Sequence, residues 1–190
     1  YVVMATTGNA RDFGDLSVAR TYARGLASKT RGFGCGGYAP NSSNSSNVID
    51  FITIATLGNS SDFGDVSYGA RGSLLTSSNA TRGIICGGSP EITDTINFVT
   101  LATLGDSLEF GDLTRSNNRL AGLSNQTRGC FGGCNPETNV IDYITIAQTG
   151  NAVDFGNLTN SRQSCRGLAS TTRGLFVGGL DGSSPYTSLN

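Results

Sequence analysis

The sequence of 190 residues has no histidine and no tryptophan, and it contains only one methionine and four prolines. Without histidine there is no Ser-His or Cys-His pair for nucleophilic catalysis and no imidazole ligand for a metal. Paired carboxylates do occur, but they recur along the chain, whereas a catalytic pair is expected to be singular. We therefore predict that the protein is not an enzyme and uses neither a metal nor another cofactor.

Charged residues are also scarce. Lysine and arginine total 13, aspartate and glutamate total 14, and the net charge is −1. Nucleic-acid-binding domains normally carry a clustered basic surface, so nucleic acid is not an expected partner. No apolar run is long enough to span a membrane, and no membrane partner is expected. The first residue, Tyr1, falls in what reads as the middle of a repeat, which indicates a processed chain or a piece of a longer one.

Five cysteines are present, an odd number. Cys35 and Cys86 each precede a glycine pair, at the position where other copies of the repeat carry Phe131 and Val177. A position that accepts Cys, Phe and Val is typical of a buried apolar site, so we predict that both thiols are reduced and buried. The remaining three are Cys130, Cys134 and Cys165; the first two have C-x3-C spacing without any histidine, and no zinc site is expected.

The sequence is dominated by a fourfold repeat. The segment Asp12-Phe13-Gly14-Asp15 returns three times, and its phenylalanines are 50, 47 and 45 residues apart. Thr-Arg-Gly and a glycine pair also occur once in each copy. A period of this length indicates supersecondary units that bury their apolar faces against one another. The residues assigned a structural role in the repeat are Phe13, Phe63, Phe110, Phe155, Arg31, Arg82, Arg128, Arg173, Gly37, Gly88, Gly133 and Gly179.

Each copy predicts four short antiparallel strands. In the best-defined copy these are residues 22–28, 32–38, 48–55 and 62–66, and the third strand recurs at 96–101 and 140–146. The connection 39–47 carries an Asn/Ser tract and is longer than its counterparts, which is typical of an exposed loop. The expected fold class is therefore all-β.

The repeat resembles the kelch β-propeller repeat. The matching residues are Gly36-Gly37, Phe51, Phe63 and Arg71, although kelch blades usually carry tryptophan where this chain has phenylalanine. The resemblance implies a kelch-like β-propeller of four four-stranded antiparallel blades, or alternatively part of a larger propeller or repeat array. The sequence pattern of the repeat is also similar to the variant kelch-like repeats of bacteriophage and environmental viral structural proteins.

We expect one repeat domain, 1–190, with units of approximately 1–47 (an N-terminal half-blade plus the start of the next), 48–95, 96–139 and 140–190. Residues 1–6 and the region of Phe13 read as a third and a fourth strand, whereas 174–179 reads as a second strand. These complementary halves predict closure of a four-bladed ring within one chain, which removes sheet edges. The alternative is that the half-blade of one copy completes that of another, head to tail, as in a fibre.

Two repeated sets are candidate binding residues. The four arginines Arg31, Arg82, Arg128 and Arg173 would lie on one face and form a ring for an anion; the favoured alternative pairs each with a carboxylate of the Asp-Phe-Gly-Asp segment. Oxygen-bearing side chains at Asn59, Asp62 and Asp65 raise the question of calcium, but they lack the spacing of calcium loops. We expect them to accept hydrogen bonds from turn amides and to pair with the arginines.

These observations favour a non-enzymatic structural or adhesive module of a virion surface or extracellular fibre, which presents variable loops to glycans or proteins. Its partners would be other structural proteins or copies of itself. The alternative is a cytoplasmic, kelch-type protein-binding adaptor. In a glycosylating source, the acceptor motifs would be those at Asn41, Asn44, Asn59, Asn79, Asn125 and Asn157.

Overall fold

The chain is all-β. The computed structural model describes residues 1–40, 44–67, 69, 72, 74–90, 92–182, 184–187 and 189, and no helix occurs within them. Three four-stranded antiparallel sheets, here called units 1 to 3, follow one another along the chain. Unit 1 comprises β1 (Arg24–Ala27), β2 (Arg31–Cys35), β3 (Val48–Thr53) and β4 (Ser61–Asp65). Unit 2 comprises β5 (Leu75–Ser78), β6 (Arg82–Cys86), β7 (Thr93–Thr100) and β8 (Leu108–Asn117). Unit 3 comprises β9 (Ala121–Ser124), β10 (Arg128–Gly132), β11 (Thr138–Thr145) and β12 (Val153–Arg162).

A terminal hairpin follows unit 3. It consists of β13 (Arg166–Ala169) and β14 (Gly174–Val177), which pair antiparallel in the register of a first and a second strand. Two further short strands, β15 (Leu180–Asp181) and β16 (Ser184–Pro185), form a separate two-stranded ladder. The predicted strands are thus confirmed for all three complete units and for β14.

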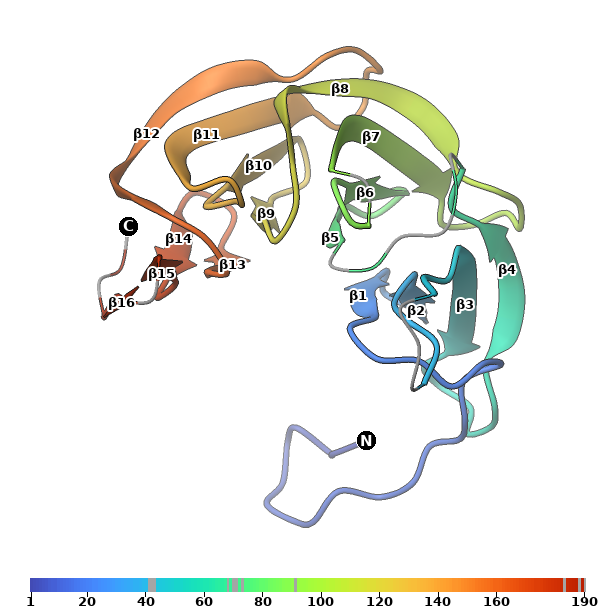
Figure 1. Cartoon of the computed structure of the whole chain (residues 1–190). Helices are drawn as coiled ribbons and strands as arrows, with labels where there is room; N and C mark the ends of the chain where they lie inside the picture. The colour runs from blue at the N-terminus through green and yellow to red at the C-terminus, as the bar shows by residue number, and fades with distance from the viewer. Residues whose placement is uncertain are drawn as a thin grey trace.

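The units stand side by side in an open arc (Figure 1). Within each unit the strands are ordered as in the sequence, so the first strand lies on the inner side of the arc and the fourth on the outer side. The third and fourth strands of every unit share one irregularity in register, beginning at Ile49, Ile96 and Ile141. A repeated β-bulge of this kind bends the outer strand, which then reaches over the neighbouring unit.

The cores lie between units. One cluster joins units 1 and 2 and includes Leu26, Phe63 and Val99, and a second joins units 2 and 3 around Phe131 and Ile144. Alternating strand residues point to opposite faces of a sheet, so unit 2 buries one face against unit 1 and the other against unit 3. No helix among the described residues has the length and apolar character of a membrane span.

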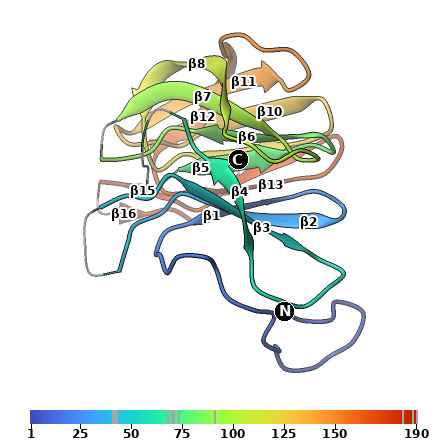
Figure 2. The same ribbon diagram turned by 90° about the vertical axis from the view of Figure 1, so that its right-hand side faces the viewer.

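The ends of the arc differ from the sequence prediction. Residues 1–16, here called the N-terminal segment, contain no strand, although a third and a fourth strand were expected there. The segment runs outside unit 1 and does not reach β14, so the predicted four-bladed ring is open in this structure (Figures 1 and 2). Each unit is held to the next by repeated contacts between distant residues, such as Gly105 N to Phe63 O, and the arrangement that these contacts set leaves the ends of the arc apart.

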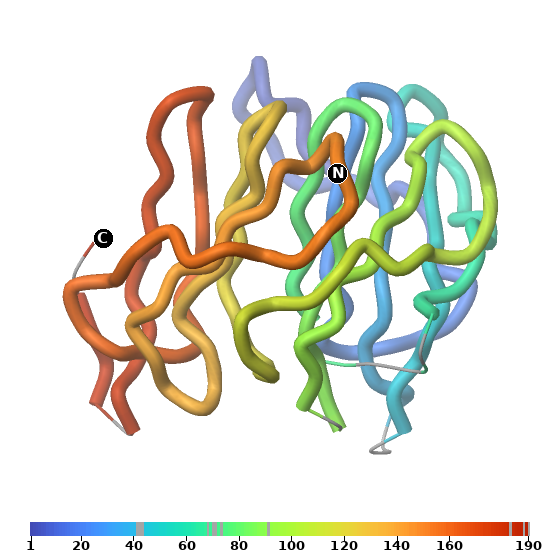
Figure 3. The backbone as a smooth tube through the Cα atoms, turned by 90° about the horizontal axis from the view of Figure 1, so that it is seen from above, coloured from blue at the N-terminus to red at the C-terminus, as the bar shows by residue number. Residues whose placement is uncertain are grey.

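The sheets are also out of phase with the predicted units. They begin at Arg24, Leu75 and Ala121, and the predicted boundaries 95/96 and 139/140 fall inside β7 and β11. A period read from sequence fixes the length of a repeat but not the point at which one sheet ends and the next begins. The two edges of the arc are distinct (Figure 3): the turns joining first to second strands lie along one edge, and the loops joining second to third strands lie along the other, here called the loop edge.

Candidate functional site

The repeated arginines bind within and between units. The guanidinium of Arg31 lies 4.8 Å from the ring centroid of Phe51, and that of Arg82 lies 4.6 Å from Phe98. Both also donate to a backbone carbonyl of the following unit: Arg31 Nη1 to Leu101 O at 3.0 Å and Arg82 Nη1 to Ile146 O at 2.9 Å. The ion pair found in the described part of the chain, Arg20–Asp50, does not involve these arginines, so the expected pairing with carboxylates of the Asp-Phe-Gly-Asp segments stays a prediction. An aromatic face and an accessible carbonyl satisfy these cations.

Arg128 and Arg173 lack some of the contacts that Arg31 and Arg82 make. Arg128 stacks on Tyr143 at 4.6 Å, as its counterparts do on their own rings. The structure gives it no carbonyl of a following unit, because the terminal hairpin has no third strand. For the same reason Arg173, immediately before β14, has no third-strand aromatic ring in its own two-stranded sheet. All four arginines begin or precede second strands along one edge of the arc, but three of them are already engaged by aromatic rings.

The polar residues of the third-to-fourth-strand turns also hold neighbouring units together. Asp65 N donates to Asp106 Oδ1 at 2.9 Å, and Asp112 N donates to Asn151 Oδ1 at 3.1 Å. Asn59 accepts the equivalent bond from Asp15 N at 3.0 Å. Of the three side chains singled out in the sequence, Asn59 thus accepts a backbone amide, and its counterparts Asp106 and Asn151 accept amides of the fourth strands β4 and β8. No group of three or more His, Cys, Asp or Glu side chains arranged for a metal occurs among the described residues.

The glycine of each Asp-Phe-Gly segment allows the close approach of two units. Gly64 has φ +145°, and a side chain there would overlap Gly105 O; Gly111 has φ +149° and stands in the same relation to Gly150 O. The preceding phenylalanine packs edge-on against the third-strand aromatic, as in Phe98–Phe110 at 6.0 Å. The repeat motif thus combines a buried ring with a backbone that only glycine adopts easily.

The cysteines behave as predicted. All five are free and buried, and Cys35 and Cys86 are completely enclosed. Burial raises the pKa of the Cys35 thiol to about 12. Such thiols are poor nucleophiles and act as small apolar core residues.

The glycosylation motifs largely coincide with turns that use the asparagine side chain. Asn79 Oδ1 accepts from Thr81 N and Arg82 N, and Asn125 Oδ1 accepts from Thr127 N and Arg128 N. These side chains cap the turn between first and second strands, which explains their recurrence without any modification. Asn41, and Arg71 of the kelch resemblance, lie outside the described residues.

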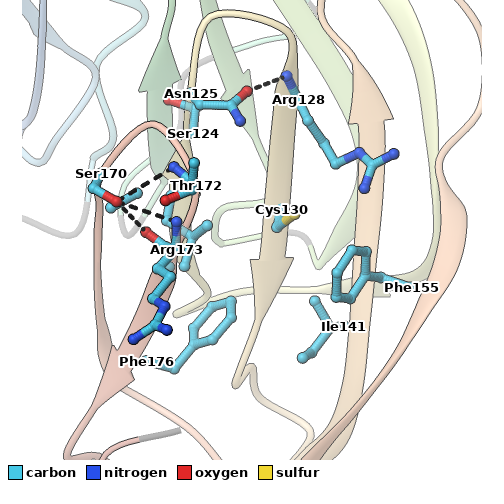
Figure 4. A pocket seen from close by; sticks show the side chains of 13 residues that line it. Ser124, Asn125, Arg128, Cys130, Ile141, Phe155, Ser170, Thr172, Arg173 and Phe176 are labelled. Carbon is cyan, nitrogen blue, oxygen red and sulfur yellow. Dashed lines mark hydrogen bonds between the residues drawn. The ribbon is translucent and has the colours of Figure 1, made fainter.

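A cavity of about 320 Å³ opens between unit 3 and the terminal hairpin (Figure 4). Apolar atoms of Leu123, Cys130, Ile141 and Phe176 form its floor, and its lining also includes Arg128, Phe155 and Arg173. At the two complete junctions the corresponding space is filled by third-strand side chains of the following unit, such as Ile144 and Ile146. The cavity is thus the place of a missing third strand.

A second hollow, of about 540 Å³, lies at the inner side of the arc on the loop edge. Arg24, Arg119 and Arg166 contribute three positive charges, and none of the described residues that line it is acidic. Tyr22 and Tyr38 form one wall, with their rings edge-on at 6.1 Å, and the Tyr38 hydroxyl bonds with the Ser89 hydroxyl. We call these five Arg and Tyr residues, with the Ser and Asn residues between them, the inner hollow.

The charges of the inner hollow interact. Burial lowers the pKa of Arg24, and the positive charge of Arg166 lowers it further, so the two cations are close enough to repel one another. Arg119 donates to Gln163 Oε1 at 3.1 Å, which fixes the side chain on the rim. Tyr22, Arg119 and Ser164 occupy the same register and all have left-handed φ near +56°. A strained backbone conformation that recurs at equivalent positions of a site serves to orient the side chains there.

Sequence reasoning did not single out the inner hollow. The sequence did contain a signal, because Arg-Gly-Leu-Ala occurs at both 24–27 and 166–169. The first strands of units 2 and 3, however, do not begin with arginine. Only the curvature of the arc brings residues from four repeats together there. Comparison with protein-family models gives no match, and comparison with curated proteins finds no relative.

Proposed function

We propose that this chain is a non-enzymatic structural and adhesive module, built from kelch-like propeller blades and carried on a virion surface or an extracellular fibre. Its ligand would be an acidic glycan held in the inner hollow. The observation that carries the proposal is the composition of that hollow: three arginines and two tyrosines on a β scaffold, with no acid among the described residues of its lining.

The chemistry of the hollow suits a sugar acid. Guanidinium groups bind carboxylates or sulfates through charge-assisted hydrogen bonds, and they do so most strongly where they are partly buried. Tyrosine offers an apolar ring for the C–H face of a sugar and a hydroxyl for its polar groups. Because Arg24 and Arg166 repel one another in the free protein, an anion between them would also relieve that repulsion.

The scaffold around the hollow supports a presenting role. Each second-to-third-strand loop is anchored by the same kind of bridge, as in Thr21↔Tyr38, Gly72↔Ser89, Asn118↔Asn135 and Gln163↔Leu180. The loops beyond these anchors differ in length and sequence from copy to copy. Constant anchors with variable loops are typical of a binding surface carried on a rigid framework. The other recurring polar and charged side chains, which could otherwise take part in catalysis, are engaged in contacts between units, and this supports a non-enzymatic role.

The test is binding of two oligosaccharides of equal length, one a polyuronate and one neutral. We expect the polyuronate to bind and its affinity to fall with salt. The variant Arg24→Gln/Arg166→Gln should weaken binding at least about tenfold, whereas the control Arg173→Gln, on the opposite edge, should not. Equal binding of the neutral sugar, no binding of the polyuronate, or an equal loss in the control would contradict the proposal.

A further inference from the structure

We propose that the terminal hairpin of one copy binds residues 1–13 of a second copy, so that chains join head to tail and each contact completes a four-stranded unit. This inference rests on the junction between units and is independent of any ligand in the inner hollow. Residues 1–13 would supply the third and fourth strands that β13 and β14 lack.

The N-terminal segment already has the shape of those strands. Tyr1 N donates to Arg11 O at 2.6 Å, and Arg11 N donates to Tyr1 O at 2.8 Å. Tyr1 and Phe13 pack edge-on at 6.0 Å, as do Phe98–Phe110 at 6.0 Å and Tyr143–Phe155 at 5.9 Å. Tyr1 therefore occupies the position of the third-strand aromatic, and Phe13 that of the fourth.

The strand register of unit 3 then predicts which residues would pair in the completed unit. In unit 3, Cys130 of the second strand is opposite Tyr143 of the third, so by the same count Leu175 of β14 would be opposite Tyr1. Arg173 would gain the ring of Tyr1, as Arg128 has Tyr143. Arg128 would donate to Met4 O, as Arg82 does to Ile146 O.

The apolar surfaces also match. Val2 and Met4 are 56% and 96% exposed, whereas their counterparts Ile144 and Ile146 are 2% and 0% exposed between units 2 and 3. In the second copy's cavity they would cover the floor described above, which includes Leu123 and Phe176. Burying two apolar side chains of this size favours association.

A glycine supports the same register. Gly14, Gly64 and Gly111 each approach a glycine carbonyl of the following turn, and side chains there would collide with Gly58, Gly105 and Gly150. Gly156 belongs to this series, yet nothing lies within 4 Å of its side-chain position. Its counterpart by count is Gly8, which likewise faces open space. In the joined units the two would meet.

On the other face of the proposed contact, β13 and unit 1 also have apolar surfaces that would fit together. Leu26 packs where a side chain at Gly83 would stand, and Leu123 does the same over Gly174. Leu168 has the same register on β13 but is exposed. On unit 1, Gly32 and Ile52 line a hollow of about 560 Å³, which would receive Leu168 of the preceding copy.

The N-terminal segment does not complete the terminal hairpin of its own chain, because it is fixed to unit 1. Gly58 N donates to Phe13 O at 2.9 Å, Ser60 N to Asp15 O at 2.8 Å and Ser17 N to Ser60 Oγ at 2.9 Å. Arg20 adds a buried ion pair with Asp50 at 2.6 Å. To reach β14 of the same chain, the segment would have to give up these contacts or the arc would have to close against them.

The experiment measures mass against concentration by light scattering and analytical ultracentrifugation. The wild-type chain should form species of increasing mass. Val2→Asp should block the N-terminal end and Leu175→Asp the β14 end, because each places a carboxylate in an apolar contact; both side chains are exposed in the free chain, so folding should be kept. Self-association of either variant should weaken at least about tenfold, and the control Leu57→Asp, on an exposed turn, should associate as the wild type does.

Mixing the two variants gives the decisive result. Val2→Asp retains a competent β14, and Leu175→Asp retains a competent N-terminal segment, so the mixture should form dimers containing one of each and nothing longer. A wild-type chain that remains monomeric, variants that associate normally, or a mixture without the mixed dimer would overturn the proposal. Circular dichroism of each variant confirms that the fold is retained.

Discussion

The junction between units 2 and 3 and the junction between unit 3 and the terminal hairpin are built from the same repeat but differ in completeness. Phe110, in the first, is 3% exposed, whereas its counterpart Phe155, in the second, is 52% exposed. The residues are chemically equivalent, and their immediate sequence is nearly the same. What differs is whether a third strand of a following unit covers them, so burial here is a property of the array and not of the repeat.

The strongest way to sharpen this comparison is to place the same substitution in both junctions. Gly111→Ala and Gly156→Ala each force alanine into a left-handed conformation, with φ +149° and +136°, at a cost on the order of 1–3 kcal/mol. Only at Gly111 would the new Cβ also meet Gly150 O, 2.4 Å away. We expect Gly111→Ala to lower the free energy of unfolding by about 1–3 kcal/mol more than Gly156→Ala, measured by urea denaturation of the dilute protein. Equal losses would show that the junctions are not distinguished by this approach of two backbones.

A second pair compares one residue type at one register. Ile146 is completely buried between units 2 and 3, whereas Ile54 is about half exposed at the free face of unit 1. Ile146→Ala should cost about 2–5 kcal/mol because it leaves a cavity. Ile54→Ala should cost less than about 1 kcal/mol in the dilute monomer. Thermal and urea unfolding of both variants measure the difference, and a large loss for Ile54→Ala would mean that unit 1 is covered even in the monomer.

The last comparison concerns the register that holds Cys35 in unit 1 and Val177 in the terminal hairpin, where the effect per pH unit is small. Burial raises the pKa of Cys35 from 9.0 to about 12, so the folded state keeps a proton that the unfolded state loses. Stability from this source is constant below pH 9.0 and falls as the pH rises from there towards 12, by at most about 1.4 kcal/mol per pH unit. Cys35→Val should therefore show a shallower loss of stability in alkali than the wild type. Identical profiles would contradict the assignment of the slope to this thiol.

The strands of the complete units could be predicted from the sequence because their pattern is local. β3 and β4 follow from the β-branched and aromatic run at 48–53 and the Asp-Phe-Gly-Asp segment, and the same signals recur in units 2 and 3. Residues 1–6 carry the same apolar pattern as β7 and β11, yet they form no strand. A strand needs a hydrogen-bonded neighbour, and the neighbour of this segment, a second strand, is at the other end of the arc.

The site was less predictable than the fold. The arginines at 31, 82 and 128 each lie over an aromatic ring, a partner that the sequence did not indicate, because the third strand of the same sheet brings that ring beneath each guanidinium. The inner hollow draws on Arg24, Arg119 and Arg166, which are spread over more than a hundred residues. No spacing in the sequence indicates that they meet.

The sequence by itself determined the all-β character, the period of the repeat, the four-stranded plan of each unit and the burial of Cys35 and Cys86. These properties depend on alternation, turn residues and glycine positions, which act over a few residues. Tertiary structure decided that the arc stays open, which surfaces remain uncovered and where the positive charges gather. The physical reason is that the step from one unit to the next is set by bonds between distant residues, such as Gly105 N to Phe63 O and Arg82 to Ile146 O. Small differences in that step, repeated along the array, determine whether its ends meet.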